Sequence, residues 1–227
     1  MLIEWERLPK RMQNEAVREY YEILSRKRKA LAVKRAFDAV ASSFLLIFLS
    51  PVFLILAIAI KADSPGPVFF RQIRVTQYGK KFRIFKFRTM VTDAEKLGTQ
   101  VTTKGDPRIT RVGRVIRKYR LDELCQLIDI LRGTMSFVGT RPEVPKYVAR
   151  YTDEMLATLL LPAGVTSEAS IRYKDEEKLL EGASDVDEVY VREVLPAKMK
   201  YNLAELRGFS MLSELKIMFQ TVGAVLR

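Results

Sequence analysis

Two adjacent carboxylates, Asp122 and Glu123, follow three basic residues in the run that begins at Arg117. Neighbouring positions inside a helix point about 100° apart, but at a helix N-terminus both side chains reach the open end, where the dipole favours anions. A helix that restarts at Leu121, after Tyr119-Arg120, would place them there. An ionised carboxylate with a divalent cation on its neighbour could then attack an electrophilic phosphorus. The commoner role of such a pair is to cap the first turn of a helix, and this alternative stays open.

Basic side chains around this pair could gather phosphate oxygens. Lys86 and Arg88 alternate with phenylalanine on a β-prone run, and Arg117 shortly precedes the carboxylates. Arg141, in the loop Gly139-Thr-Arg-Pro142, offers a planar fork for bidentate binding. The sequence contains neither a P-loop nor a dinucleotide-binding fingerprint. Phosphates must therefore be bound by side chains and a metal ion.

Two features of the composition narrow the chemistry further. The chain has no histidine, which excludes Ser-His and Cys-His nucleophile pairs and histidine metal sites. Its one cysteine, Cys125, allows neither an internal disulfide nor a cysteine-rich zinc site, which suits a reducing compartment. Within an apolar helix Cys125 is more simply a small buried hydrophobic residue than a nucleophile. Catalysis must then rest on carboxylates, Lys, Arg, Ser, Thr or Tyr.

The positive charge is concentrated in one part of the chain. Residues 71–120 hold 15 Lys and Arg against 3 Asp and Glu, an excess of 12 that equals the net charge of all 227 residues. Such a local field indicates an anionic partner: nucleic acid, anionic lipid or a phosphorylated substrate. The alternative to an enzyme is a membrane-tethered protein whose basic field binds anionic lipid or nucleic acid, and the interleaved phenylalanines resemble a surface on which bases stack. A half-buried hairpin explains those rings more simply.

The elements that must position these residues predict an α+β fold that is mostly helical. Val68–Arg74 and Lys81–Phe87 read as a short β-hairpin with a turn around Gln77-Tyr-Gly79. Arg111–Leu131 has a continuous helical pattern, and Asp93–Lys104 reads as a polar loop. Further helices are expected at Tyr147–Leu161, Asp187–Lys200 and Met211–Leu226. The apolar face of the last helix, formed by Leu212, Leu215, Met218, Phe219 and Val222, is expected on the core rather than on a bilayer.

The first thirty residues read as a polar amphipathic helix, with apolar residues loosely spaced on one side. A surface or linker helix is the simplest interpretation. We therefore divide the chain into an amphipathic segment, residues 1–33, and one domain, residues 34–227. The apolar positions of the first segment are Leu8, Met12, Val17, Tyr20 and Leu24.

A long apolar run, Ala36–Ile60, begins directly after six basic residues within Arg26–Arg35, and its only charge is Asp38. A straight helix of this length would reach about 37 Å, enough for a hydrocarbon core of roughly 30 Å. The run starts too far from the N-terminus for a signal peptide. An ordinary spanning helix is therefore the simple expectation.

Ser50-Pro51 argues against a straight span, because proline removes a backbone donor and kinks a helix. The two arms would be about 22 Å and 15 Å long, each too short to cross alone. Both flanks are basic, which puts both ends on the cytoplasmic side. A helix that dips into one leaflet and returns satisfies these observations, while a kinked spanning helix fits equally well.

Seven motifs follow one another from about Lys34 to the C-terminus, and together they are far more specific than any one of them. They are Lys34-Arg-Ala-Phe-Asp38, Ser50-Pro51, Ser64-Pro-Gly-Pro-Val-Phe-Phe-Arg-Gln72, Phe82-Arg-Ile-Phe-Lys-Phe-Arg-Thr-Met90, Asp106-Pro-Arg-Ile-Thr110, Leu121-Asp-Glu-Leu124 with Gln126, and Met135-Ser-Phe-Val-Gly139 with Arg141-Pro142. By these motifs the chain resembles the bacterial sugar transferase family. Its members are monotopic phosphoglycosyl transferases, which start glycan assembly on undecaprenyl phosphate.

The resemblance implies a membrane enzyme on the cytoplasmic face of the bacterial inner membrane. The Ser50-Pro51 break would form a re-entrant membrane helix at about 36–60, with amphipathic helices at the membrane surface. The donor would be a UDP-sugar and the acceptor a polyprenyl phosphate, with membrane lipid as a further partner and no nucleic acid. A homo-oligomer stays open, and so do the sugar and the glycan pathway.

The resemblance also implies roles for single residues. Asp122 would be the nucleophile that attacks the β-phosphorus, releases UMP and holds a covalent phosphosugar until the polyprenyl phosphate collects it. Mg²⁺ would sit beside the pair, with Glu123 as the main ligand and Asp122 next to it. Further positions that match the family's active site are Lys86, Arg117, Arg141 and, in a loosely aligned region, Asp187.

Several positions depart from the family's usual pattern. Thr134 stands where an aspartate is common, and the usual Pro-Gly-Ile-Thr-Gly segment reads Pro162-Ala-Gly-Val-Thr-Ser167. Cys125 and Asp129 stand where proline and asparagine are frequent, and Thr140 replaces a usual proline. These changes fall in loops expected to touch the nucleotide or the sugar. They bear on the identity of the donor rather than on the chemistry.

Overall fold

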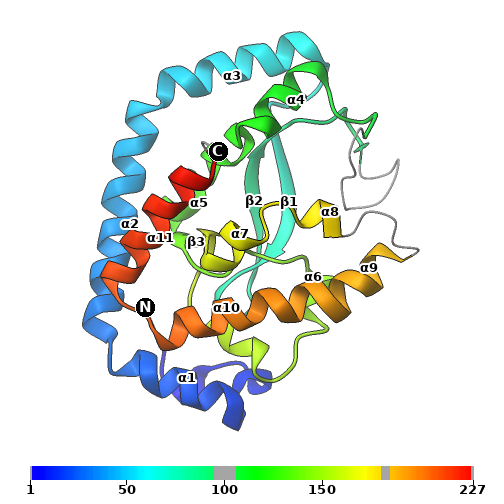
Figure 1. The fold of residues 1–227 in the computed structure, drawn as a ribbon. Helices are drawn as coiled ribbons and strands as arrows, with labels where there is room; N and C mark the ends of the chain where they lie inside the picture. The colour runs from blue at the N-terminus through cyan, green and yellow to red at the C-terminus, as the bar shows by residue number, and fades with distance from the viewer. Residues whose placement is uncertain (1, 95–105, 180–184, 226–227) are drawn as a thin grey trace.

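The computed structural model describes residues 2–94, 106–179 and 185–225 (Figure 1). Within these residues the fold is α+β and mostly helical, with two small two-stranded sheets, as the sequence predicts. Most of the loop expected at Asp93–Lys104 lies outside the described residues.

Two helices border the molecule in Figure 1: α2, Arg28–Phe48, along the left side, and α3, Ser50–Asp63, across the top. They meet at an angle of 60°. The break follows from the sequence, because Pro51 lies in the first turn of α3 and the Ser50 hydroxyl donates to the Ile47 carbonyl at 2.8 Å. Among the described helices, none alone has both the length and the apolar character needed to cross a bilayer, but this bent pair together meets both criteria.

The outer side of this pair is apolar and exposed. Large apolar residues near the end of α2 and along α3 are solvent-exposed. They are Phe44, Ile47 and Phe48 on α2, and Leu54, Ile55 and Ile58 on α3. Only a few residues of α3, such as Leu56 and Ile60, are buried against the rest of the protein. Neighbouring exposed apolar side chains of this kind are typical of surfaces that contact a membrane or another macromolecule.

The predicted hairpin is confirmed, with each end of the first strand one residue later than expected. Strand β1, Phe69–Val75, pairs antiparallel with β2, Lys81–Phe87, from Phe69↔Phe87 to Val75↔Lys81. The connection is a short 3-10 turn, Gln77–Gly79. Tyr78 and Gly79 both have positive φ there, of 59° and 73°, which suits a glycine and strains a tyrosine.

The continuous helix expected at Arg111–Leu131 is wrong, whereas the restart at Leu121 is confirmed. The chain forms α4, Arg111–Lys118, then a 3-10 helix, Leu121–Gln126, and then α5, Leu127–Arg132. Arg120 separates the first two with a left-handed φ of 54°. Apolar periodicity records which positions are buried and not whether the backbone is continuous, so it did not show the break.

A second sheet was not predicted. Strand β3, Met135–Val138, pairs parallel with β4, Ala163–Thr166. The backbones of Gly139 and Gly164 lie very close together, so a Cβ atom on Gly164 would collide with the backbone of Gly139. Strands of four residues leave too short an alternation to be recognised in the sequence.

The continuous helix expected at Tyr147–Leu161 is also wrong, although the helical structure does end there, at Leu160. The structure has a single turn, α6, Pro145–Val148, and a 3-10 helix, Met155–Leu160. Every residue of the second is buried, so the segment is a core element without the amphipathic pattern of a long surface helix.

The C-terminal half is helical. Short helices α7, Glu168–Arg172, α8, Glu176–Leu179, and α9, Val186–Val189, come first. A π-helical turn, Tyr190–Val194, then runs into α10, Leu195–Arg207, so the helix expected at Asp187–Lys200 extends further than predicted.

Helix α11, Met211–Val225, is confirmed, but most of its expected apolar face is not on the core. Leu212 and Phe219 are 80% and 77% exposed, and Val222 is also open. Ile217 is the buried position instead. The helix lies beside α2 in Figure 1, and the buried Lys34 amine pairs with the Glu214 carboxylate across the contact.

The first thirty residues pack onto the core and are not a linker. They form two 3-10 turns, Trp5–Arg7 and Lys10–Met12, and helix α1, Glu15–Ser25. All five apolar positions expected on one side are buried, in one hydrophobic cluster with residues of the 3-10 helix Met155–Leu160 and of α10. The amphipathic pattern was therefore correct, and it is the tertiary partner that the sequence did not reveal.

Candidate active site

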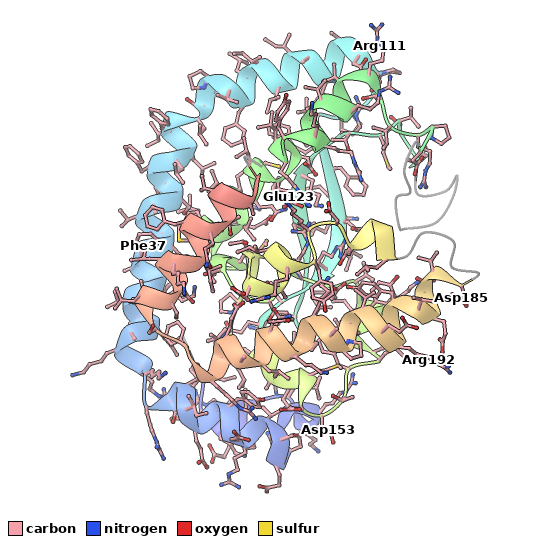
Figure 2. All side chains as sticks on the ribbon, in the orientation of Figure 1. Phe37, Arg111, Glu123, Asp153, Asp185 and Arg192 are labelled. Atoms are coloured by element: carbon pink, nitrogen blue, oxygen red, sulfur yellow. The ribbon has the colours of Figure 1, made fainter. Side chains whose placement is uncertain are left out.

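The break at Arg120 determines where the two carboxylates lie. Asp122 and Glu123 occupy the first turn of the 3-10 helix Leu121–Gln126, which packs against β2. The Glu123 amide donates to the Arg120 carbonyl at 3.3 Å, and the Cys125 thiol donates to the Asp122 carbonyl at 3.4 Å. Figure 2 shows Glu123 near the middle of the molecule.

Glu123 is held by two cations from distant parts of the chain. The Arg141 guanidinium donates to both of its carboxylate oxygens, at 3.1 Å through Nη1 to Oε2 and through a shorter bond from Nη2 to Oε1. Lys86 Nζ lies 3.4 Å from Oε1. Burial by itself would raise the pKa of Glu123, but these two charges outweigh it and hold the pKa well below its ordinary range. Glu123 is therefore an ionised anchor for Arg141 and Lys86.

Asp122 has a different environment, although it is the next residue. Burial raises its pKa above the ordinary aspartate value; the positive charge of Lys86 opposes the shift and the negative charge of Glu123 adds to it. Within the described residues, no hydrogen bond reaches the Asp122 carboxylate. Two neighbouring acids whose pKa values move in opposite directions are typical of a site that gives them different tasks.

The structure brings together five of the predicted site residues. Lys86 comes from β2, Arg117 from α4 and Arg141 from the loop after β3, while Asp122 and Glu123 lie between them. Arg117 lies on α4, which packs against the 3-10 helix that carries both carboxylates, and its positive charge opposes the rise in the pKa of Asp122. This cluster of three cations around two carboxylates is suited to bind a phosphorylated ligand.

Arg88 lies outside this cluster. Its side chain is 5% exposed, and its guanidinium donates to the Ser64 carbonyl at 2.7 Å, to the Pro65 carbonyl and to the Thr92 hydroxyl at 3.2 Å. These contacts close the turn between α3 and β1. The structure thus gives Arg88 a structural task, and its binding of phosphate stays a prediction without a supporting contact.

Asp187 also lies apart from the carboxylate pair. It is half-exposed at the start of α9 and accepts hydrogen bonds from Lys146 Nζ at 2.6 Å and from the Tyr147 hydroxyl at 2.5 Å, which lower its pKa. The Tyr147 ring packs on Tyr190 at 4.6 Å between centroids. Asp187 therefore connects to the site only through a chain of side chains, and its role as a ligand stays a prediction.

A buried charge network beside Arg141 was missed in the sequence. The Tyr190 hydroxyl, in the π-helical turn, donates to Glu143 at 2.5 Å. Lys198 Nζ lies 2.8 Å from the Glu176 carboxylate, 3.1 Å from the Tyr190 hydroxyl and 3.7 Å from the Glu143 carboxylate. The sequence did contain a sign of this network, because the polar residues Lys198 and Asn202 are four residues apart on the otherwise apolar buried face of α10.

The carboxylate pair fits Mg²⁺ in one particular way. Within the described residues, no group of three or more Asp, Glu, His or Cys side chains could hold a metal ion. Mg²⁺ commonly keeps several waters and binds through one or two carboxylates together with substrate phosphates. Asp122 and Glu123 would supply two such carboxylates, and the phosphates of a substrate would complete the donor set. Glu123 would then share its oxygens with Arg141.

Comparison with known proteins gives one consistent result. Residues 29–227 match the family model described as bacterial sugar transferase. The chain is 34% identical, over 197 residues and 86% of its length, to the UDP-N-acetylgalactosamine-undecaprenyl-phosphate N-acetylgalactosaminephosphotransferase of Aeromonas hydrophila, of which the match covers 44%. It is 36% identical, over 84% of its length, to the UDP-glucose:undecaprenyl-phosphate glucose-1-phosphate transferase of Escherichia coli (strain K12), of which the match covers 39%.

A shorter relative is matched over most of its own length. The putative undecaprenyl-phosphate N-acetylgalactosaminyl 1-phosphate transferase of Bacillus subtilis (strain 168) is 40% identical over 149 residues, which are 65% of this chain and 82% of the relative. The relatives differ in the sugar that their names give, and the first two are matched over less than half of their length.

Proposed function

Because the chain belongs to the bacterial sugar transferase family, we propose that it transfers a sugar-1-phosphate from a UDP-sugar to a polyprenyl phosphate and releases UMP. The observation that carries the proposal is the contrast between Asp122, whose pKa burial raises, and Glu123, which Arg141 and Lys86 keep ionised. A more basic carboxylate is the better nucleophile, and the fixed cations beside it receive phosphate oxygens.

The transfer takes two steps at one phosphorus atom. An oxygen of the Asp122 carboxylate attacks the β-phosphorus of the donor, and the bond from this phosphorus to the bridging oxygen breaks. UMP leaves with the electron pair, and the sugar phosphate is bound to Asp122. A phosphate oxygen of the polyprenyl phosphate then attacks the same phosphorus, and Asp122 leaves as a carboxylate. The Arg141 and Lys86 charges stabilise the negative charge of both transition states.

Glu123 and Asp122 would hold Mg²⁺ together with the phosphate oxygens of the donor. When bound, the ion neutralises charge on the pyrophosphate and so assists the departure of UMP. The task of Glu123 within the protein is to keep Arg141 and Lys86 in place.

We further propose that the protein is attached to a membrane, which the bent helix pair supports. The apolar outer side of α2 and α3, with their 60° bend, suits a re-entrant helix that enters and leaves one leaflet. The exposed Leu212 and Phe219 give α11 a second apolar side for the membrane surface. Basic residues at both ends of the pair favour the cytoplasmic face of the bacterial inner membrane.

Release of UMP tests the proposal. The purified protein is incubated with a panel of UDP-sugars and Mg²⁺, with and without a polyprenyl phosphate, and compared with Asp122→Asn. We expect UMP release and a phosphosugar adduct on the wild-type protein by intact mass, and neither on the variant. Asp153→Asn, an exposed position far from Glu123 in Figure 2, is the matched control and should be fully active. Undiminished turnover by Asp122→Asn would rule out the nucleophile.

A further inference from the structure

Helix α4 carries three basic side chains on its exposed side. Arg111, Arg114 and Lys118 are separated by three and four residues, which places them on one face of the helix. All three are exposed, and within the described residues none of them forms a salt bridge. Val115 lies on the same face and is 56% exposed. This face of α4 therefore combines three cations with an apolar side chain, all open to a partner.

The opposite face of α4 is fixed to the rest of the protein. Ile116 is buried in one cluster with Leu56 and Ile60 of α3. A Cβ atom on Gly113 would collide with the carbonyl oxygen of Thr89, so the helix lies directly on the segment that follows β2. The three cations cannot turn toward the core without losing this packing, and their exposure is a fixed feature of the fold.

Helix α4 begins beside the end of α3. Asp63, the last residue of α3, accepts a hydrogen bond from the Val112 amide at 2.9 Å. Figure 2 shows Arg111 next to this end of α3. The apolar run of α3 ends at the charged Lys61, so the proposed re-entrant pair leaves the leaflet here. Helix α4 then starts at the level of the lipid headgroups.

The chemistry of the exposed face suits the headgroups of anionic phospholipids. Each lysine or arginine close to an anionic membrane surface strengthens binding about fivefold, whereas a surface without net charge attracts it less. The apolar stems of such side chains lie in the interface while their charges reach the phosphates. Tyr119, at the end of α4, is 54% exposed and has the amphipathic ring that is common at this depth.

Helix α4 also connects this face to the carboxylate pair. After α4 the chain turns at Arg120, which has a φ of 54°, and enters the 3-10 helix that carries Asp122 and Glu123. The two helices pack against each other. The position of α4 on the bilayer therefore determines the height of the carboxylate pair above it. A polyprenyl phosphate carries its phosphate at headgroup level, whereas a UDP-sugar arrives from water.

We propose that Arg111, Arg114 and Lys118 bind the phosphates of anionic phospholipids, and that this contact holds the carboxylate pair at the depth of the acceptor phosphate. The inference rests on the proposed function, because it concerns how the same site meets its membrane acceptor. Anionic lipid then accelerates the second step, in which the polyprenyl phosphate reacts, and leaves the first step unchanged.

Lipid composition tests the inference. The protein is placed in nanodiscs of phosphatidylcholine alone, or of equal parts phosphatidylcholine and phosphatidylglycerol. Turnover is measured at varied polyprenyl phosphate, and the first step is measured as the burst of UMP without acceptor. We expect phosphatidylglycerol to raise kcat/KM for the acceptor about fivefold or more and to leave the burst unchanged. An equal kcat/KM in the two lipids would overturn the inference.

Two triple variants show whether α4 is responsible for the response to lipid. Arg111→Gln, Arg114→Gln and Lys118→Gln together should abolish the response, and glutamine keeps the helix propensity of the replaced residues. The matched control removes three exposed charges elsewhere, by Lys10→Gln, Arg150→Gln and Lys200→Gln, and should respond like the wild-type protein. An undiminished response in the α4 variant would overturn the inference.

A fluorescent label on α4 gives a readout that does not depend on activity. Cys125 is fully buried, so a single cysteine in Val115→Cys, or in Lys200→Cys as control, takes the label without background. We expect a nitroxide on the headgroup of phosphatidylglycerol to quench the label at position 115 and not the label at position 200. An unquenched label at position 115 would overturn the inference whatever the activity. Quenching without UMP release from any UDP-sugar would support the lipid contact and overturn the proposed function.

The acceptor and the donor are the other anions that these cations could bind. If they bound the acceptor phosphate, phosphatidylglycerol would compete and slow turnover, and the α4 triple variant would raise the KM for polyprenyl phosphate in phosphatidylcholine alone. If they bound the nucleotide, the same variant would raise the KM for the UDP-sugar in both lipids. Either result would overturn the inference.

Discussion

Arg141 donates both arms of its guanidinium to the Glu123 carboxylate, while the carboxylate of the adjacent Asp122 accepts no hydrogen bond within the described residues. The two acids thus differ in the direction of their pKa shifts and in their hydrogen bonds, although they share one helical turn. The metal-binding and nucleophilic roles that we propose for Glu123 and Asp122 would need such a difference.

The planar fork of Arg141 should matter more than its charge. In Arg141→Lys one hydrogen bond to Glu123 is lost, and a lysine cannot hold a carboxylate in a bidentate manner. We expect UMP release to fall about 30-fold to 100-fold, which corresponds to roughly 2–3 kcal/mol. Single-turnover kinetics measure the change, and Arg192→Lys at an exposed position is the matched control. An Arg141→Lys variant within threefold of the wild-type rate would contradict the role of the fork.

The raised pKa of Asp122 predicts the acid side of the pH profile. A nucleophile must be ionised, so kcat/KM should fall as the pH drops through a pKa above the ordinary aspartate value of 3.8. Lys86→Gln removes a positive charge that lowers this pKa, and should move the acid limb to higher pH. Lys10→Gln, at an exposed position, should leave the limb in place. If the acid limb of the Lys86→Gln profile lies at the wild-type pH or at a lower pH, the assignment of this limb to Asp122 is wrong.

Glu205 predicts how stability depends on pH. Burial raises its pKa from 4.5 to about 7, although the Glu168 amide that donates to its carboxylate opposes the shift. Because the folded pKa lies above the unfolded one, the fold favours the protonated acid. This stabilisation is complete below pH 4.5 and is lost as the pH rises through 7.

Glu205→Gln imitates the protonated acid and keeps an acceptor for the Glu168 amide. Its free energy of unfolding should equal that of the wild-type protein near pH 4.5 and exceed it by up to about 3 kcal/mol at pH 8. Denaturant unfolding in detergent at both pH values measures the difference, with the exposed Glu19→Gln as control. An equal effect of Glu205→Gln at the two pH values would speak against burial as the cause.

Cysteine labelling should place both ends of the bent helix pair on the same side of the membrane. Cys125 is fully buried, so single cysteines introduced at Lys29 and Ala62, which are exposed, can be labelled without background. We expect a membrane-impermeant maleimide to react with both in inverted vesicles and with neither in intact spheroplasts. Reaction of the two positions from opposite sides would instead establish a spanning helix.

Local pattern in the sequence was sufficient for the hairpin and for the kink at Ser50-Pro51. It also indicated the restart at Leu121, although the apolar periodicity predicted one continuous helix there. The hairpin depends on β-prone runs around a glycine turn, the restart on a short interruption of the helical pattern, and the kink on a proline. In each case the residues act on the conformation of their own backbone. The ordered motifs also brought Lys86, Asp122, Glu123 and Arg141 into one predicted site, and the structure places all four together.

Only the tertiary structure decided what each side chain does there. Lys86 and Glu123 are 37 residues apart and Arg141 and Glu123 are 18 apart, so no helical or strand period relates them. Arg88, two residues from Lys86, contributes instead to the turn between α3 and β1. The sequence by itself determined the residue types and their local geometry. Burial and long-range pairing determine the pKa values and the hydrogen-bond partners of these side chains, and both exist only once the chain has folded.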